Sequence, residues 1–123
     1  MSERRLLKGN EAVVYGALAA GVRCYFGYPI TPSTEIAEGC ALKLPRVGGK
    51  FIQMEDELAS MAAVIGASVA GVKSMTATSG PGFCLGVETI SFMASAQLPA
   101  VIVDCMRPGP GDGEILAAQG DYF

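Results

Sequence analysis

The sequence has 123 residues, 50% of them hydrophobic and 17% charged, and its mean hydropathy is +0.38. These values exclude a disordered tail, and the length allows one compact domain at most, because little surface would remain to build a second core. Nine basic against twelve acidic residues give a net charge of -3, which is the wrong sign for a protein that binds nucleic acid through its phosphates.

The first part of the chain predicts a helix, a strand and a second helix. Residues Gly9–Ala20 are rich in alanine and are followed by a glycine, with Asn10 as the candidate N-cap. A β-prone run over residues 22–28 comes next and is stopped by a proline. Thr31 is then the expected N-cap of a helix over residues 32–42, which begins with proline.

The second part of the chain continues the alternation. A strand is expected over residues 50–54, a helix over 56–70, a strand over 74–78, a helix over 83–96 and an apolar strand over 100–105. In the helix over 56–70 small residues cover most of the surface, and the larger apolar residues form one stripe at helical spacing: Leu58, Met61, Ala62, Ile65 and Val69.

This alternation predicts a single α/β domain over residues 1–123, with a mainly parallel sheet and helices on both faces. Loops over residues 28–33, 78–83 and 106–113 would leave the carboxyl ends of the strands, where such sheets bind ligands. Only ten residues follow the last loop, so the sheet looks incomplete. We therefore expect the chain to be a fragment or half of an obligate assembly.

The sequence contains no histidine, so any catalysis must use carboxylates, hydroxyls, arginine or a cofactor. No apolar run reaches the roughly 18 residues that a bilayer requires, and no signal-peptide core follows the start. We expect a cytoplasmic protein without membrane contact. The cysteines form no C-x-x-C pair and lie in or beside apolar segments, which predicts reduced core thiols: Cys24, Cys40, Cys84 and Cys105.

Two glycine-containing segments come close to nucleotide-binding motifs. Residues 80–86 follow a strand and open a helix, but they carry one residue too many between the second and third glycines for a dinucleotide fingerprint. Residues 66–74 resemble a phosphate-binding loop with an extra residue before Lys73, and they run from helix to strand rather than from strand to helix. The first match is weak and the second is discarded, and Gly80 and Gly82 are equally explained by a tight turn.

Three motifs together resemble the alpha subunit of 2-oxoacid:ferredoxin oxidoreductases. They are residues 27–33 (GYPITPS), 53–59 (QMEDELA) and 75–83 (MTATSGPGF), and their order and spacing are those of that family. The similarity extends over nearly the whole chain and corresponds to the amino-terminal, pyrimidine-binding domain of a thiamine diphosphate enzyme. It implies an incomplete domain of that type, active in the oxidative decarboxylation of a 2-oxoacid.

The resemblance implies that Glu57 hydrogen-bonds the aminopyrimidine ring of thiamine diphosphate, whose own imino form takes the proton from thiazolium C2. No histidine is then required. From the residues alone, Glu55, Asp56 and Glu57 are better explained as acids that favour a helix start. The cofactor contacts implied by the resemblance are Pro29, Ile30, Thr31, Glu57, Ser79, Gly80, Pro81 and Gly82.

Two further catalytic residues are implied by the resemblance. The Thr31 hydroxyl would lie near the substrate carboxylate, and Arg107 would bind that carboxylate through its fork of donors. The alternatives are a helix N-cap for Thr31 and a solvated loop charge for Arg107. The loop after Arg107 departs from the family pattern, because Pro108 replaces a glycine and Gly111-Asp112 replace two hydroxyl residues.

The resemblance also implies partners. Thiamine diphosphate would be shared with a beta subunit that carries the diphosphate-binding domain. Mg²⁺ and iron–sulfur clusters would lie on partner chains, since this chain lacks cysteine-rich cluster motifs. The small-residue face of the helix over 56–70 is the expected contact surface.

A cluster-bearing subunit would pass electrons to ferredoxin, and the reaction would convert a 2-oxoacid, CoA and oxidised ferredoxin into acyl-CoA, CO₂ and reduced ferredoxin. The motifs favour 2-oxoglutarate or a branched-chain 2-oxoacid and leave pyruvate open. The alternatives are a non-catalytic assembly subunit with the same fold and a nucleotide-binding dehydrogenase module.

Overall fold

The computed structural model describes residues 4–109, 114–116 and 118–121, in which four strands form one sheet. The strands are β1 (Cys24–Gly27), β2 (Lys50–Gln53), β3 (Ser74–Thr78) and β4 (Val101–Asp104). Their order across the sheet is β2-β1-β3-β4, and every pair is parallel. The sequence-based prediction of a parallel α/β sheet is confirmed.

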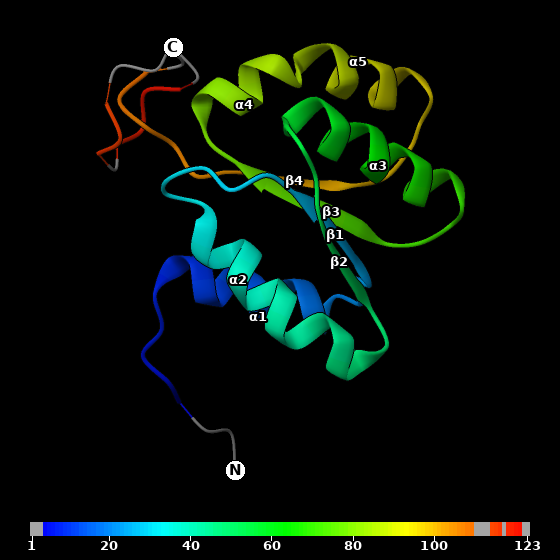
Figure 1. The fold of residues 1–123 in the computed structure, drawn as a ribbon, viewed down its shortest axis with the longest axis horizontal. Coiled ribbons are helices and arrows are strands. Elements are labelled where there is room, and N and C mark those ends of the chain that lie inside the picture. Colours follow the sequence, from blue (N-terminus) through cyan, green and yellow to red (C-terminus); the bar gives the residue numbers. More distant parts are fainter. Residues whose placement is uncertain (1–3, 110–113, 117, 122–123) are drawn as a thin grey trace.

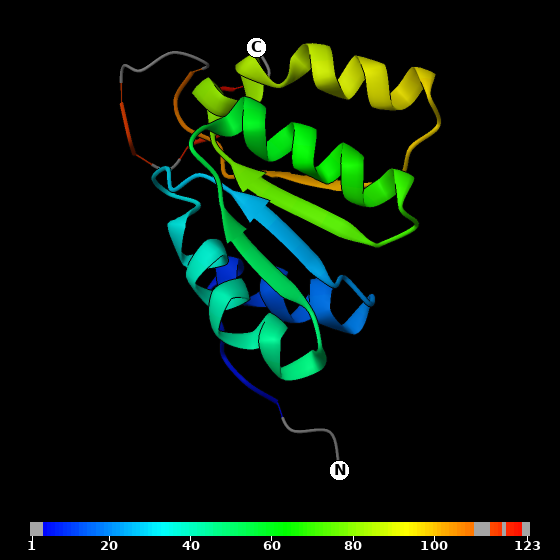
Figure 2. The same ribbon diagram turned by 45° about the vertical axis from the view of Figure 1, so that its right-hand side comes forward.

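Helices cover both faces of the sheet (Figures 1 and 2). On one face lie α1 (Gly9–Ala19) and α2 (Thr34–Lys43), the second of which continues into a short 3₁₀ turn, η1 (Leu44–Val47). On the other face lie α3 (Glu57–Val69), α4 (Gly80–Leu85) and α5 (Val87–Ser95). None of the helices in the described part of the chain is long and apolar enough to cross a membrane.

The main core lies between the sheet and the α1/α2 layer. Tyr25 from β1 is fully buried there and stacks on Phe51 of β2, with 5.4 Å between the ring centroids. Gly27 must be glycine, because an added Cβ would lie 2.5 Å from the Tyr25 ring. The other buried members of this core are Val14, Val22, Ile36, Cys40, Leu44, Met75 and Ala77.

Asn10 is not the N-cap of α1, contrary to the prediction. The helix begins after Lys8, whose backbone N–H donates to the Glu11 carboxylate at 3.0 Å. The Asn10 side chain lies inside the first turn and donates to the Pro32 carbonyl at 2.8 Å and to Glu35 Oε2 at 3.0 Å. Asn10 therefore joins α1 to the start of α2 instead of capping its own helix.

Thr31 is not the N-cap of α2, and this prediction was also wrong. The Thr31–Pro32 peptide is cis, and the backbone N–H and hydroxyl of Ser33 both donate to the Ile30 carbonyl at 2.8 Å. This turn closes before the helix, so α2 begins at Thr34 with Ser33 in the cap position. The Thr31 side chain is exposed.

The helix predicted over residues 83–96 is two helices. The first, α4, begins at Gly80, with Pro81 in its first turn, where the missing N–H of proline costs nothing. The helix breaks at Gly86, whose Cα faces the Met61 side chain of α3 so closely that an added Cβ would collide with it.

Helix α3 packs on the sheet through a different face from the predicted apolar stripe. Of that stripe only Met61 is buried, whereas Leu58 is 49% and Val69 68% exposed. Apolar residues surround this helix, so periodicity alone does not select the inner face. The buried line includes two serines whose hydroxyls donate to backbone carbonyls, and it consists of Glu57, Ser60, Met61, Val64 and Ser68.

All four cysteines are free. Cys40 is buried, and Cys24 and Cys105 are half-buried. Cys84 lies exposed on α4, so the prediction of a core thiol is wrong there, because this short helix buries its glycines, Gly80 and Gly82, instead. Burial raises the pKa of the Cys40 thiol to about 11.

Candidate functional site

The loops over residues 28–33 and 78–83 and the described start of the third loop, residues 106–109, meet at one end of the sheet (Figure 2). Two hydrogen bonds join them. Arg107 Nε, beyond β4, donates to the Thr31 carbonyl beyond β1 at 2.8 Å. The Ser79 hydroxyl, at the end of β3, donates to the Cys105 carbonyl at the same distance. The site is therefore built from loops that the sheet brings together from distant parts of the chain.

Glu57 is the first residue of α3 and is only 9% exposed. The helix-start explanation applies to both acids, since Glu57 lies in the first turn of α3 and Asp56 Oδ1 accepts a hydrogen bond from the Ala59 N–H at 2.7 Å. Within the part of the chain that the structure describes, the Glu57 carboxylate has no hydrogen-bond partner. A nearly buried carboxylate in this position is suited to a ligand that donates a hydrogen bond.

Gly82 makes room for Glu57. A Cβ on Gly82 would lie 2.5 Å from Glu57 Cγ and would also collide with the Thr78 hydroxyl. The glycine-rich start of α4 therefore packs directly against the acidic side chain at the start of α3. Sequence motifs 53–59 and 75–83 are in contact in the fold, although neither motif predicts that contact by itself.

Arg107 is 6% exposed and is therefore not a solvated loop charge. Its backbone N–H donates to Asp121 Oδ2 at 2.8 Å, and its side chain reaches the Thr31 carbonyl. The structure thus brings Thr31 and Arg107 together. Pro108 is exposed in the same loop, whereas Gly111 and Asp112 lie outside the described residues.

The remaining predicted cofactor contacts differ in accessibility. Pro29 is exposed and Ile30 is half-buried in the loop after β1. Ser79 is fully buried, and its hydroxyl is used to join the ends of β3 and β4. Pro81 is half-buried at the start of α4, next to the buried Gly80.

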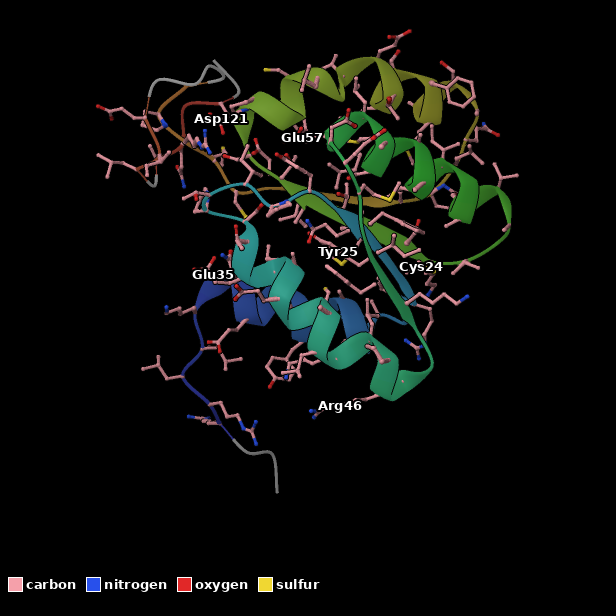
Figure 3. The ribbon with its side chains drawn as sticks, viewed as in Figure 1. Cys24, Tyr25, Glu35, Arg46, Glu57 and Asp121 are labelled. Carbon is pink, nitrogen blue, oxygen red and sulfur yellow. The ribbon has the colours of Figure 1, made fainter. Side chains whose placement is uncertain are left out.

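Two aspartates at this end of the molecule were not identified from the sequence. Asp121 is 7% exposed and lies against Gly80, where an added Cβ would be 2.5 Å from Asp121 Oδ1. Asp104 ends β4, and burial together with the charge of Asp121 raises the pKa of its carboxyl to about 6. Asp104 could have been noticed as an acid in an apolar strand, but no local pattern marks Asp121. Figure 3 shows Glu57 and Asp121 at the same end of the molecule.

Residues 15–123 match the family model described as pyruvate flavodoxin/ferredoxin oxidoreductase, thiamine diphosphate-binding. The chain belongs to this family. It is 58% identical over 118 residues to the 2-oxoglutarate synthase subunit KorA of Methanocaldococcus jannaschii, covering 95% of this chain and 32% of that relative. It is 56% identical to the ketoisovalerate oxidoreductase subunit VorB of Methanothermobacter thermautotrophicus, covering 96% of this chain and 34% of that relative.

A solved structure of the family has the same fold. It is the 2-oxoglutarate:ferredoxin oxidoreductase from Magnetococcus marinus with 2-oxoglutarate, coenzyme A and succinyl-CoA bound. The TM-score is 0.87 at 47% sequence identity, and the match covers 89% of this chain and 19% of that one. The chain therefore spans about a third of the length of the curated relatives named above and a smaller share of this enzyme.

Proposed function

We propose that this chain forms the pyrimidine-binding side of the thiamine diphosphate site of a 2-oxoacid:ferredoxin oxidoreductase. The observation that carries the proposal is Glu57, a nearly buried carboxylate without a hydrogen-bond partner among the described residues, packed against Gly82. The residues present fit the cofactor, because the ring nitrogen of an aminopyrimidine can share a proton with such a carboxylate. Membership of a thiamine diphosphate-binding family supports this assignment.

When bound, thiamine diphosphate supplies a nucleophilic thiazolium carbon that its own aminopyrimidine activates. Glu57 would hold the proton shared with the ring nitrogen, and burial strengthens that hydrogen bond by excluding water. Gly82 keeps the space beside Glu57 open. The backbone at residues 29–31 and 79–82 would surround the ring, whereas the buried Ser79 hydroxyl maintains the loop geometry.

Arg107 is suited to bind the carboxylate of a 2-oxoacid. Its side chain is held at Nε by the Thr31 carbonyl, and the guanidinium carries further donors that can reach an anion. The exposed Thr31 side chain lies on the loop that this hydrogen bond fixes, so its hydroxyl is available beside the same anion. The names of the relatives support 2-oxoglutarate or a branched-chain 2-oxoacid as substrate, with pyruvate as a further candidate.

The proposed enzyme is cytoplasmic and needs partner chains. The diphosphate, Mg²⁺ and the iron–sulfur clusters would be held by partners, including a beta subunit, with CoA as acyl acceptor and ferredoxin as electron acceptor. We infer that α3 contacts the partner through its outer stripe, which we define as Leu58, Ala62, Ile65 and Val69. This stripe replaces the small-residue face, part of which is turned toward the sheet.

The test is Glu57→Gln in the complex assembled with its partner subunits. We expect 2-oxoacid-dependent reduction of a viologen dye to fall by about 100-fold or more, because the amide cannot hold the shared proton. The matched control is Glu55→Gln, which neutralises an exposed acid two residues away and should leave activity within twofold. Near-normal turnover of the Glu57 variant would contradict the proposal.

Calorimetry separates the catalytic function from a purely structural one. The assembled complex should bind thiamine diphosphate, and Glu57→Gln should weaken that binding. A complex that binds no thiamine diphosphate would identify this chain as a non-catalytic assembly subunit. Dye reduction measured over a panel of 2-oxoacids with CoA would then identify the substrate class.

A further inference from the structure

Asp121 and its neighbour Gly120 hold both backbone polar groups of Arg107. Asp121 Oδ2 accepts a hydrogen bond from the Arg107 N–H at 2.8 Å, and the Gly120 N–H donates to the Arg107 carbonyl at 3.0 Å. Gly120 passes so close to Pro108 that an added Cβ would collide with the Pro108 backbone. Two residues that follow Arg107 by 13 and 14 positions therefore bond its backbone carbonyl and its backbone N–H.

Asp121 also connects Arg107 with the other two loops of the site. Its carboxylate packs against Gly80, at the glycine-rich start of α4. Arg107 in turn bonds the Thr31 carbonyl in the loop after β1. One aspartate thus contacts the loop after β3 directly and the loop after β1 through a single arginine side chain.

The burial of the Asp121 carboxylate costs more free energy than a residue that only closes a surface loop would need to lose. Asp121 is almost fully buried, and its Oδ1 is buried without a hydrogen-bond partner among the described residues. A second carboxylate, Asp104, lies close enough for the charge of Asp121 to raise its pKa. Buried acids with unused acceptor capacity are found where the geometry of a site requires them.

We propose that Asp121 is a positioning residue that aims the Arg107 guanidinium at the carboxylate of the 2-oxoacid. This inference rests on the function proposed above for Arg107. An arginine side chain has several rotatable bonds, and anchoring its backbone and its Nε leaves little motion to lose when substrate binds. Asp121 should therefore act on substrate affinity and leave cofactor binding unchanged.

The experiment compares Asp121→Ala with wild type in the assembled complex. We expect KM for the 2-oxoacid to rise at least tenfold, with kcat within threefold and with KM for CoA and Kd for thiamine diphosphate within twofold. Asp121→Asn keeps an oxygen that can accept the Arg107 N–H, so its KM should rise less than threefold. The control is Glu114→Gln, which removes an exposed charge from the same segment and should leave KM unchanged.

A double-mutant cycle with Arg107→Lys tests whether Asp121 acts through that arginine. Asp121→Ala should raise KM less than twofold when position 107 is lysine, because the fork that Asp121 aims is absent. Additive effects on KM, or a joint loss of thiamine diphosphate binding and thermal stability, would overturn the inference. Asp121 would then only stabilise the loop that contains Arg107. If the alanine variant does not assemble, Asp121→Leu, which fills the same buried space without an acceptor oxygen, takes its place in the cycle under the same criterion.

Failure of this inference can be distinguished from failure of the proposed function. If the wild-type complex binds no thiamine diphosphate, or if Glu57→Gln is fully active, the proposed function is wrong. If Glu57→Gln is inactive while Asp121→Ala has a normal KM for the 2-oxoacid, only the role assigned to Asp121 is wrong.

Discussion

At the carboxyl end of the sheet, the surroundings of a single residue change its pKa, and Asp104 is the clearest case. Burial, and after it the charge of Asp121, raises the pKa of the Asp104 carboxyl from its ordinary 3.8 to about 6. The folded state therefore binds this proton more tightly than the unfolded state does. The resulting stabilisation is complete below about pH 4 and is lost as the pH rises through 6.

Asp104→Asn should remove the contribution of this carboxyl to the pH dependence of the stability of the folded state. Between pH 4 and 6 the wild type should lose stability relative to the variant as the pH rises, because only the wild type must release a proton from a buried site. The measurement is the difference in unfolding temperature between the two assembled complexes at several pH values. A difference that stays constant from pH 4 to 7 would contradict the assignment.

Gly82 tests the packing around Glu57. Gly82→Ala should reduce 2-oxoacid turnover by about tenfold or more, because the new methyl group overlaps the Glu57 side chain and the Thr78 hydroxyl. The control is Gly16→Ala, at an exposed position of α1 with no atom within 4 Å of the added Cβ. That variant should be fully active and slightly more stable, by up to about 1 kcal/mol. Equal activity of both variants would show that Gly82 does not shape the site.

At the scale of elements, the sequence predicted the four strands found in the described part of the chain. It missed the helix boundaries where a polar side chain bonds a distant segment instead of capping its own helix. β3 occupies the predicted residues 74–78, and α3 lies within the predicted 56–70. Asn10 and Thr31 were predicted as caps because they are good capping residues. In the fold Asn10 bonds the Pro32 carbonyl, and the Thr31 carbonyl accepts from Arg107. Such long-range partners are invisible to local patterns.

The start of α3 provides a prediction about an element. Asp56→Ala should lower the free energy of unfolding by about 1 kcal/mol, since it removes the side chain that caps the Ala59 N–H. Asp56→Asn should restore most of this stability, because the amide oxygen can accept the same hydrogen bond. Denaturant midpoints of the two variants and the wild type measure the effect. Identical midpoints for alanine and asparagine would show that the cap contributes nothing.

At the scale of the whole molecule, the family and the parallel sheet could be predicted from the sequence, but the assembly of the site could not. Glu57 was found from a motif, whereas its contact with Gly82 depends on how α3 and α4 pack. Asp121 was missed because its partner, the Arg107 N–H, is 14 residues away along the chain. The buried face of α3 could not be read from its apolar stripe, because Leu58 and Val69 of that stripe are exposed.

The outward-facing residues of α3 lead to a prediction about assembly. The outer stripe of α3 is apolar and lies on the side of the sheet opposite to α1 and α2 (Figure 1). Exposed apolar surface of this kind is typical of a contact between protein chains. Ala62→Glu places a charge in the middle of the stripe without crowding the core of the chain, since Ala62 is exposed.

Ala62→Glu should therefore reduce co-purification with the partner subunit by at least tenfold, because a charge at the centre of an interface loses its hydration. Ala12→Glu is the matched control: the same substitution at an exposed position of α1, on the opposite face of the sheet. The amount of partner retained on the tagged chain and the circular dichroism spectra of both variants are the measurements. If both variants retain the partner equally with native spectra, the contact lies elsewhere, and the exposed apolar side chains of α3 need another explanation.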